Sequence, residues 1–366
     1  MRPFRMARGW LLSSLIRGIG EFRRGGRDSL FVFYDLDLYP ISFDFAYFLV
    51  WADEERRRRG LERMHVAFVP MADELARPLP PGYDQVVDLE SRRWRFHNIV
   101  EPLARLVPSC AGVTVCGDRD RAAALALSVR HRCPTVDLSP LCPVDLGEVY
   151  RDIISELRLV SADLGLRAPR QAVRYIGKWI DHHAGGRELV VITLRQYGVD
   201  PARNSNLEAW GDFARRLDRN RFLPVVVPDT DHAFDRPPPE LRDLVLYDPP
   251  AWNLELRMAL YEAAHLNMLV SCGPATLCVL SPVARYLMFK ISVPGVHLAS
   301  EQILKRLGFV PGETPPFATP FQKWIWDRDD LATIEAEFVG MSRRIDAGAL
   351  EARAAGSTEG DLERWA

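Results

Sequence analysis

Two short segments in the second half of the chain combine residue types that bind phosphate. The first holds four polar residues behind an apolar run at 189–194: Arg195, Arg203, Asn204 and Ser205. A guanidinium group donates to two phosphate oxygens at once, and a helix N-terminus offers free N–H groups and a positive dipole. The pattern predicts a phosphate clamp. The alternative is that Asn204 or Ser205 is an ordinary N-cap and Arg195 a surface arginine.

The second segment also joins an apolar run, at 267–271, to the start of a helical pattern. It reads Ser271, Cys272, Gly273, Pro274, Ala275 and Thr276. Pro274 suits the first helical position, and Gly273 permits a positive φ or the close approach of a ligand, although such turns also occur without one. Ligands of open parallel sheets bind outside the carboxyl ends of the strands. Both segments are therefore expected to face one crevice, where Asp229, at another strand end, could contact a ribose or base.

The rest of the chain supplies the elements that would position these residues. Short β-branched and aromatic runs alternate with longer amphipathic ones, which predicts βαβ units around parallel sheets. Expected strands are 29–34, 65–70, 85–88, 112–116, 189–194, 222–227, 244–247, 267–271 and 286–291. Expected helices are 45–59, 98–106, 118–130, 150–164, 170–183, 206–217, 253–264, 274–284 and 330–344, with a further one at 347–365.

A length of 366 residues predicts two domains. The predicted fold class is α/β, with two Rossmann-like lobes that each contain a parallel sheet. Two successive helices with no strand between them, at 150–164 and 170–183, indicate a helical linker between the lobes. The predicted parts are a basic N-terminal segment (1–28), a first lobe (29–149), the linker (150–186), a second lobe (187–323) and C-terminal crossover helices (324–366).

Part of the second lobe resembles the donor lobe of GT-B glycosyltransferases. The resemblance rests on a strand and arginine loop from residue 191 on, and on two runs: Trp210-Gly211-Asp212-Phe213-Ala214-Arg215-Arg216-Leu217 and Val225-Val226-Val227-Pro228-Asp229. It is similar to bacterial lipopolysaccharide heptosyltransferases and, more remotely, to fucosyltransferases, over about residues 187–292. Two departures concern the phosphate site. Ser271 stands where the family has an acidic residue before Gly-Pro, and Leu194-Arg195 replaces the doubled arginine of the fucosyltransferases.

The resemblance implies two facing lobes, with the nucleotide-sugar donor in the C-terminal lobe and the acceptor in the N-terminal one. It also implies catalysis without a metal or other cofactor, and closing helices, with Trp324 and Trp326 packing the crossover back toward the first lobe. Inverting transfer needs a base that deprotonates the acceptor hydroxyl. Asp35, Asp37 and Asp44 follow the first strand, and Asp44 is the preferred candidate, with a helix N-cap as its alternative role.

Other patterns that could bind a metal are treated as chance. Four D-x-D triplets begin at Asp35, Asp118, Asp229 and Asp327 in a chain rich in Asp. The adjacent His182 and His183 point to different sides of a helix. None of the six cysteines forms a C-x-x-C pair, which indicates reduced thiols in a cytoplasmic protein. We therefore assign no metal.

The favoured function is transfer of a sugar from a nucleotide-sugar to a bacterial surface-polysaccharide or glycoconjugate acceptor, with Arg195 helping to neutralise the leaving diphosphate. A sugar-nucleotide 2-epimerase and a non-catalytic scaffold are the alternatives. A net charge of −2 gives no basic field for nucleic acid. Donor sugar, nucleotide, acceptor, stereochemistry and oligomeric state do not follow from the sequence.

The N-terminal segment is strongly basic, with seven arginines against Glu21 before Asp28. Phe4, Leu11 and Leu15 fall on one side of a helical wheel, a pattern typical of a basic helix in a membrane interface. A helix packed on its own domain or a disordered tail are the alternatives. Membrane contact here would give a peripheral location at the inner face of the cytoplasmic membrane and a lipid-linked acceptor.

Deletion of residues 1–27 tests this expectation. The truncated protein should no longer sediment with vesicles that contain anionic lipid, since the basic charges and apolar side chains are removed together. Nucleotide binding should be unchanged. Equal sedimentation of the full and truncated proteins would contradict membrane contact through this segment.

Overall fold

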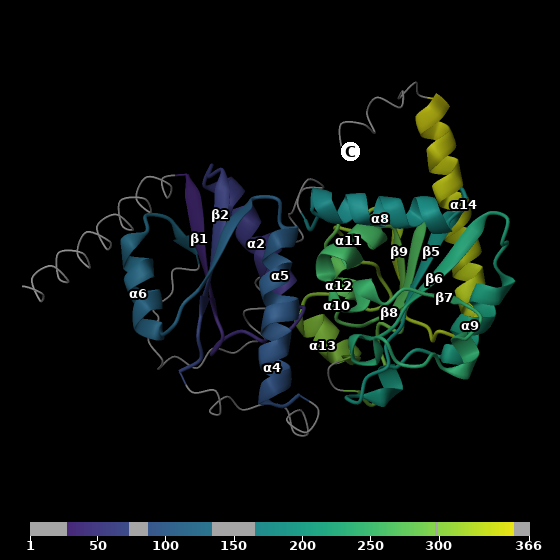
Figure 1. Cartoon of the computed structure of the whole chain (residues 1–366), viewed down its shortest axis with the longest axis horizontal. Coiled ribbons are helices and arrows are strands. Elements are labelled where there is room, and N and C mark those ends of the chain that lie inside the picture. The colour runs from purple at the N-terminus through teal and green to yellow at the C-terminus, as the bar shows by residue number, and fades with distance from the viewer. Residues whose placement is uncertain (1–27, 73–86, 134–164, 297–298, 355–366) are drawn as a thin grey trace, which may run out of the picture. The chain divides into compact units, whose positions relative to one another are not determined.

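A computed structural model of the chain describes residues 28–72, 87–133, 165–296 and 299–354 (Figure 1). The chain divides into two compact units, Met1–Arg167 and Ala168–Ala366. Each contains one sheet of parallel strands with helices packed on it, so the α/β class and the two parallel sheets predicted from the sequence are confirmed. The units are described one at a time.

The first unit is built on a four-stranded sheet in the order β3-β2-β1-β4. Its strands are β1 (Ser29–Asp35), β2 (Arg63–Val69), β3 (Cys110–Val115) and β4 (Arg132–Cys133). Every residue of β1 is buried, which explains its continuous apolar sequence. Helix α2 (Phe45–Arg58) follows β1, and α6 (Arg119–Ser128) follows β3. Between β2 and β3, α4 (Leu89–Arg95) continues through a π-turn (Phe96–Val100) into α5 (Glu101–Leu103) and a 3₁₀ turn (Ala104–Leu106).

The second unit contains a six-stranded parallel sheet in the order β10-β9-β8-β5-β6-β7. Its strands are β5 (Glu188–Thr193), β6 (Phe222–Val227), β7 (Val245–Leu246), β8 (Leu266–Val270), β9 (Tyr286–Phe289) and β10 (Gln322–Trp324). Its helices are α8 (Arg170–His183), α9 (Leu207–Arg216), α10 (Pro249–Trp252), α11 (Leu254–Ala263), α12 (Ala275–Val279), α13 (Glu301–Arg306) and α14 (Leu331–Ala354).

The two faces of this sheet are covered by different helices (Figure 1). Val190 and Ile192 of β5 join a core with Trp210 of α9 and Phe338 of α14. The hydroxyl of Thr193 lies 2.9 Å from that of Tyr261 on α11, on the opposite face. Successive strand residues point to opposite faces, so α9 and α14 cover one face and α11 the other. Helix α8 packs against α11.

Several predicted boundaries were wrong. The helix expected at 274–284 ends at Val279, because Pro282 lacks an N–H and disfavours the helical conformation in the residue before it. The strand expected at 85–88 does not form in its described part, where Asp88 instead caps α4 by accepting from the Ser91 N–H. Helix α14 is continuous to Ala354, where a break after residue 344 was expected.

Strands β4 and β10 and helix α13 were missed by the sequence patterns. Trp324, expected in the crossover, lies in β10. Its ring packs on Phe309, and the Trp326 Nε1–H donates to the carbonyl of Glu313, both within the second unit. The helix expected at 150–164 lies outside the described residues, and the proposed domain boundaries stay predictions.

Asp329 is the buried group on which the start of α9 depends. Its side chain is 3 % exposed, and Oδ2 accepts from the Asn206 N–H at 2.8 Å and from Trp210 Nε1 at 2.9 Å. Lys290 Nζ lies 3.4 Å from Oδ1. We expect Asp329→Ala to lower the free energy of unfolding by about 3 kcal/mol, because it leaves buried donors and a partly buried ammonium without their acceptor.

Chemical denaturation measures this loss. Asp330→Ala is the matched control, since Asp330 is the adjacent residue, is exposed, and accepts from the Thr333 N–H at the start of α14. Loss of that cap should cost about 1 kcal/mol. Equal losses in the two variants would contradict the role given to Asp329.

Candidate functional site

The strand order of the second unit places a crevice between β5 and β8. From β5 the chain moves outward through β6 to β7, and then returns across β5 to β8 before continuing to β9 and β10. Neighbouring connections therefore leave the carboxyl ends of β5 and β8 in opposite directions, which opens the space where ligands bind in sheets of this kind. Arg195 and Ser271 follow these two strand ends, as the sequence predicted.

Arg195 holds together the loop that follows β5. It is 5 % exposed, and its guanidinium donates to the carbonyls of Val199 at 2.6 Å and Asp200 at 3.2 Å, and to the side-chain oxygen of Asn204. Its backbone N–H donates to the Ser205 hydroxyl at 2.9 Å. Burial, and then the nearby charge of Arg203, lower the pKa of Arg195. The structure thus gives Arg195 a positioning role in the loop.

Asn204 and Ser205 belong to the same loop and do not cap α9. The side-chain oxygen of Asn204 accepts from the Tyr197 N–H at 3.0 Å, and the side-chain amide of Asn204 donates to the Tyr197 carbonyl at 3.1 Å. The N-cap of α9 is Asn206, whose side chain accepts from the Ala209 N–H. The N-cap role weighed for Asn204 and Ser205 was therefore wrong, because their side chains fold back onto the loop.

The start of α9 also already faces a carboxylate. Asp329 accepts from the Asn206 N–H there, so the position that a helix dipole offers to an anion is partly occupied by a side chain of the protein. Lys290, at the end of β9, donates to the Asn204 carbonyl at 2.6 Å and adopts a positive φ of 53°. Anion binding must therefore rely on side chains of the crevice more than on this helix end.

Arg203 connects the loop to the turn after β8. Its Nη2 donates to the Ser271 carbonyl at 3.2 Å, and its buried Nε–H has no hydrogen-bond partner among the described residues. In that turn, Pro274 is the N-cap of α12, Ala275 and Thr276 open the helix, and Gly273 is exposed without a positive φ. The conformational reason given for Gly273 is therefore absent, and its remaining advantage is that no side chain blocks approach to the turn.

Asp229 lies at the end of β6 and completes the group. Its Oδ2 accepts from the Gln196 N–H at 3.0 Å. Burial raises the pKa of Asp229, and this hydrogen bond together with the charge of Arg257 opposes that rise. Hydrogen bonds thus join residues that the sequence places after three strand ends. These are Arg195, Arg203, Asn204 and Ser205 after β5, Asp229 after β6, and Ser271 after β8.

Arg257 on α11 belongs to the same group and was missed by sequence reasoning. It is 1 % exposed and donates to the Pro250 carbonyl at 2.5 Å and the Tyr261 hydroxyl at 3.3 Å, while its Nη2 has no hydrogen-bond partner in the part of the chain that the structure describes. Its charge acts on both Asp229 and Cys272. The sequence did contain a signal for Arg257, because an arginine within an otherwise apolar helix pattern is expected to be buried, and a buried charge needs compensating partners.

Arg195, Arg203 and Arg257 share one property. Each donates to carbonyl, amide or hydroxyl oxygens, and within the described ranges none forms an ion pair with a carboxylate. Burial raises the pKa of Cys272, which lies beside them, to about 11, so that thiol is neutral at physiological pH. The crevice consequently carries an excess of positive charge that is only partly balanced by Asp229.

In the first unit, two of the three candidate acids are already paired. Asp35 is buried and forms two hydrogen bonds with Arg119, at 2.6 and 2.8 Å, and Asp37 lies 2.8 Å from the same guanidinium. Asp44 is exposed and accepts from the Ser42 hydroxyl at 2.7 Å. Asp44 stands at the N-cap position of α2, but its side chain makes no capping hydrogen bond. Its role as a base stays a prediction.

The described ranges contain neither a candidate metal site nor a candidate membrane span. These residues contain no group of three or more His, Cys, Asp and Glu side chains placed to hold a metal ion. No helix among them is both long and apolar enough to cross a membrane. The basic segment 1–27 lies outside the described residues, and membrane contact through it stays a prediction.

Comparison with known proteins gives a likeness in fold. No protein-family profile matches the sequence, and no curated protein matches it. Among solved structures, the ADP-heptose lipopolysaccharide heptosyltransferase II of E. coli is similar over 87 % of this chain and 99 % of its own, with a TM-score of 0.50 and 11 % identity. The chain has a GT-B-like fold.

Two other similar structures have lower scores. A glycosyl transferase family 9 protein from Veillonella parvula matches with a TM-score of 0.43 and 11 % identity, over 80 % of this chain and 94 % of its own. The α-1,6-fucosyltransferase NodZ, soaked with GDP-fucose, matches with a TM-score of 0.38 and 14 % identity, over 73 % and 97 %. The GT-B-like fold confirms the resemblance drawn from residues 187–292. At such identities it says nothing of which residues act.

Proposed function

We propose that this protein is a glycosyltransferase whose nucleotide-sugar donor binds with its diphosphate at the β5–β8 crevice. The observation that carries the proposal is the set of three arginines without carboxylate partners, Arg195, Arg203 and Arg257, around the turn after β8. Removing a cation from water is costly unless an anion compensates it. A diphosphate supplies that anion, and a leaving diphosphate gains charge during sugar transfer, so fixed cations favour the reaction.

The three arginines would act differently. Arg203 has a buried Nε–H without a partner and reaches the Ser271 carbonyl, so it is suited to contact the diphosphate directly. The guanidinium of Arg195 already donates hydrogen bonds to Val199, Asp200 and Asn204. It would therefore keep the loop in place and add charge, and Arg257 would add charge from beneath. The hydroxyl groups of Ser271 and Thr276 would complete the donor site, since the backbone N–H groups of Ser271, Ala275 and Thr276 already donate to carbonyls. No metal is invoked.

Arginine substitution tests the diphosphate site. Wild-type protein should be stabilised against heating by pyrophosphate and by one or more of ADP, GDP, UDP and CDP. Arg203→Ala should weaken this binding by roughly tenfold or more, because it removes hydrogen bonds between charged groups. Thermal shift and calorimetric titration measure the change.

Arg216→Ala is the matched control, because Arg216 is exposed on α9 and paired with Glu335. It should bind as wild type does. Arg195→Ala should lower both the binding and the melting temperature, since the loop loses its central hydrogen bonds. A wild-type protein that binds neither pyrophosphate nor any nucleotide would refute the proposal and favour a scaffold role.

We propose Asp44 as the base that deprotonates the acceptor hydroxyl of a glycan or lipid-linked acceptor. Its carboxylate is exposed, follows a central strand of the first unit, and accepts from the Ser42 hydroxyl at 2.7 Å. Asp35 and Asp37 are less suited because Arg119 already occupies oxygens of both carboxylates.

Asp44→Asn should lower kcat by about 100-fold or more, the range found when a general base is lost. Nucleotide affinity should stay unchanged, because the donor site lies in the other unit. Release of nucleoside diphosphate is measured with and without added acceptor, with Asp120→Asn, another exposed carboxylate of the first unit, as control. Donor turnover without any acceptor would favour an epimerase, and full activity in Asp44→Asn would exclude this base.

A further inference from the structure

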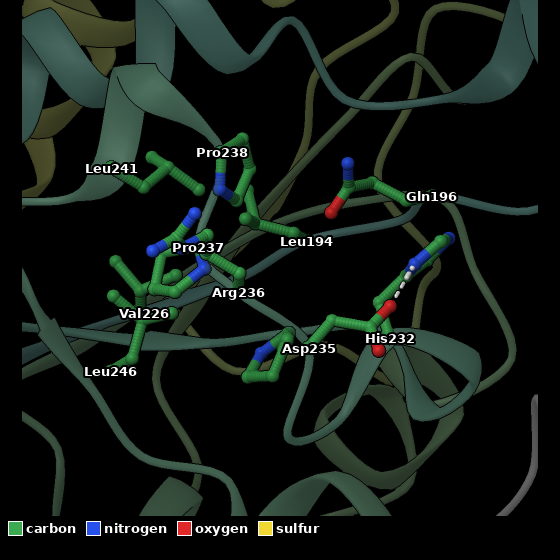
Figure 2. Close-up of a pocket in the computed structure, with 11 residues that line it drawn as sticks. Leu194, Gln196, Val226, His232, Asp235, Arg236, Pro237, Pro238, Leu241 and Leu246 are labelled. Carbon is green, nitrogen blue, oxygen red and sulfur yellow. Dashed lines mark hydrogen bonds and ion pairs between the residues drawn. The ribbon is translucent and has the colours of Figure 1, made fainter.

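A separate cavity lies beside the crevice, at the carboxyl ends of β5, β6 and β7 (Figure 2). Its volume is about 170 Å³. Sites for whole small molecules usually measure roughly 300–1,000 Å³, so this cavity takes one part of a larger ligand. Its walls are mainly aliphatic: Leu194, Val226, Pro228, Pro237, Pro238, Leu241 and Leu246. A flat ring system suits such walls, since both of its faces lose contact with water.

Four polar residues also line the cavity: Gln196, His232, Asp235 and Arg236. Asp235 Oδ2 lies 2.9 Å from His232 Nδ1. Figure 2 shows the Asp235 carboxylate turned toward His232, with Arg236 placed elsewhere on the wall of the cavity. Within the described ranges, Arg236 has no hydrogen bond or ion pair with another side chain. A carboxylate that contacts His232 and a guanidinium without a side-chain partner in the described ranges thus both line a mainly apolar space.

The backbone of the short loop that carries these residues is constrained. Phe234 adopts a positive φ of 69° although it is not a glycine, and the Asp235 N–H donates to the His232 carbonyl at 3.2 Å. The prolines at 237 and 238 then fix the chain direction where the loop ends. A left-handed residue costs on the order of 1–3 kcal/mol, and such conformations concentrate at ligand sites. The turn at Phe234 brings His232 and Asp235 to one cavity.

The cavity is joined to the diphosphate crevice through Gln196. This residue follows Arg195, donates its backbone N–H to Asp229, and also lines the cavity. The crevice lies between β5 and β8, whereas the cavity lies on the β6 and β7 side of β5. Adjacent strands are about 4.8 Å apart, so the two sites are separated by about the length of one ribose.

We propose that this cavity binds the base of the donor nucleotide and selects guanine. The inference rests on the proposed function, because the diphosphate must occupy the neighbouring crevice. Guanine presents two adjacent N–H donors, at N1 and N2, which a carboxylate accepts together, and two adjacent acceptors, O6 and N7, which an arginine contacts with two hydrogen bonds. Asp235 and Arg236 supply that pair. Adenine, uracil and cytosine offer no such combination to the two charged groups.

Calorimetric titration of the full chain with pyrophosphate, GDP, ADP, UDP and CDP tests this assignment. Wild-type protein should bind GDP at least about tenfold more tightly than the other three nucleotides. Asp235→Asn and Arg236→Met should each weaken GDP binding by about tenfold and remove the preference. Neither should alter the affinity for pyrophosphate, which does not reach the cavity. Arg242→Ala is the control, since Arg242 is an exposed arginine of the same segment that does not line the cavity.

The outcomes separate the two proposals. Pyrophosphate binding combined with equal affinities for all nucleotides, or with preference for another base, overturns the assignment of guanine and leaves the diphosphate site standing. Loss of pyrophosphate affinity in Asp235→Asn overturns it as well, because the substitution would then act on the crevice. Failure to bind any of the five ligands overturns both. Asp235 and Arg236 are exposed, so their variants are expected to fold.

Discussion

The hydrogen bonds of the Arg195 guanidinium organise the carboxyl edge of the second unit. Three oxygens of the following loop converge on this one side chain, and the Ser205 hydroxyl accepts from its backbone N–H. The loop so formed carries Arg203 to the turn after β8 and Gln196 to Asp229. It also receives Lys290 from the end of β9. Three different connections of the sheet are thereby held at one place, which the thirteen residues between β5 and α9 could not maintain without an internal partner.

Charge balance is the second constraint on this edge. Several surface arginines of the second unit face carboxylates, as Arg215 and Arg221 do. Those of the crevice instead have neutral oxygen partners, and Arg257 keeps one donor unpaired although it is almost fully buried. A protein tolerates such an arrangement when its remaining interactions are strong or when a ligand completes the charge pair. The deep core beneath, built around Trp210, Phe213 and Phe289, provides the rigid support.

The elements with a clear periodic pattern could be predicted well. Helix α8 has the predicted bounds, β6 agrees fully, and β5 and α9 differ by one residue at their ends. The failures share a cause. Strands β4 and β10 have only two and three residues, too few to show alternation. Helix α12 is shorter than expected because Pro282 ends it, although the apolar pattern of the sequence continues as if the helix did. Asp88 was predicted to end a strand because its role as an N-cap can be seen only once α4, the helix that follows it, is known.

The sequence alone determined the α/β class, the strands that end in Arg195, Asp229 and Ser271, and hence the edge at which a ligand would bind. These features depend on local apolar runs and on the rule that parallel strands end at one edge. Tertiary structure decided which side chains remain available there. It turned Asn204 and Ser205 inward, placed Asp329 at the start of α9, and brought Arg257 from a distant helix under the crevice. No periodic pattern contains this information, because it depends on how the loops fold and on which elements meet in the folded chain.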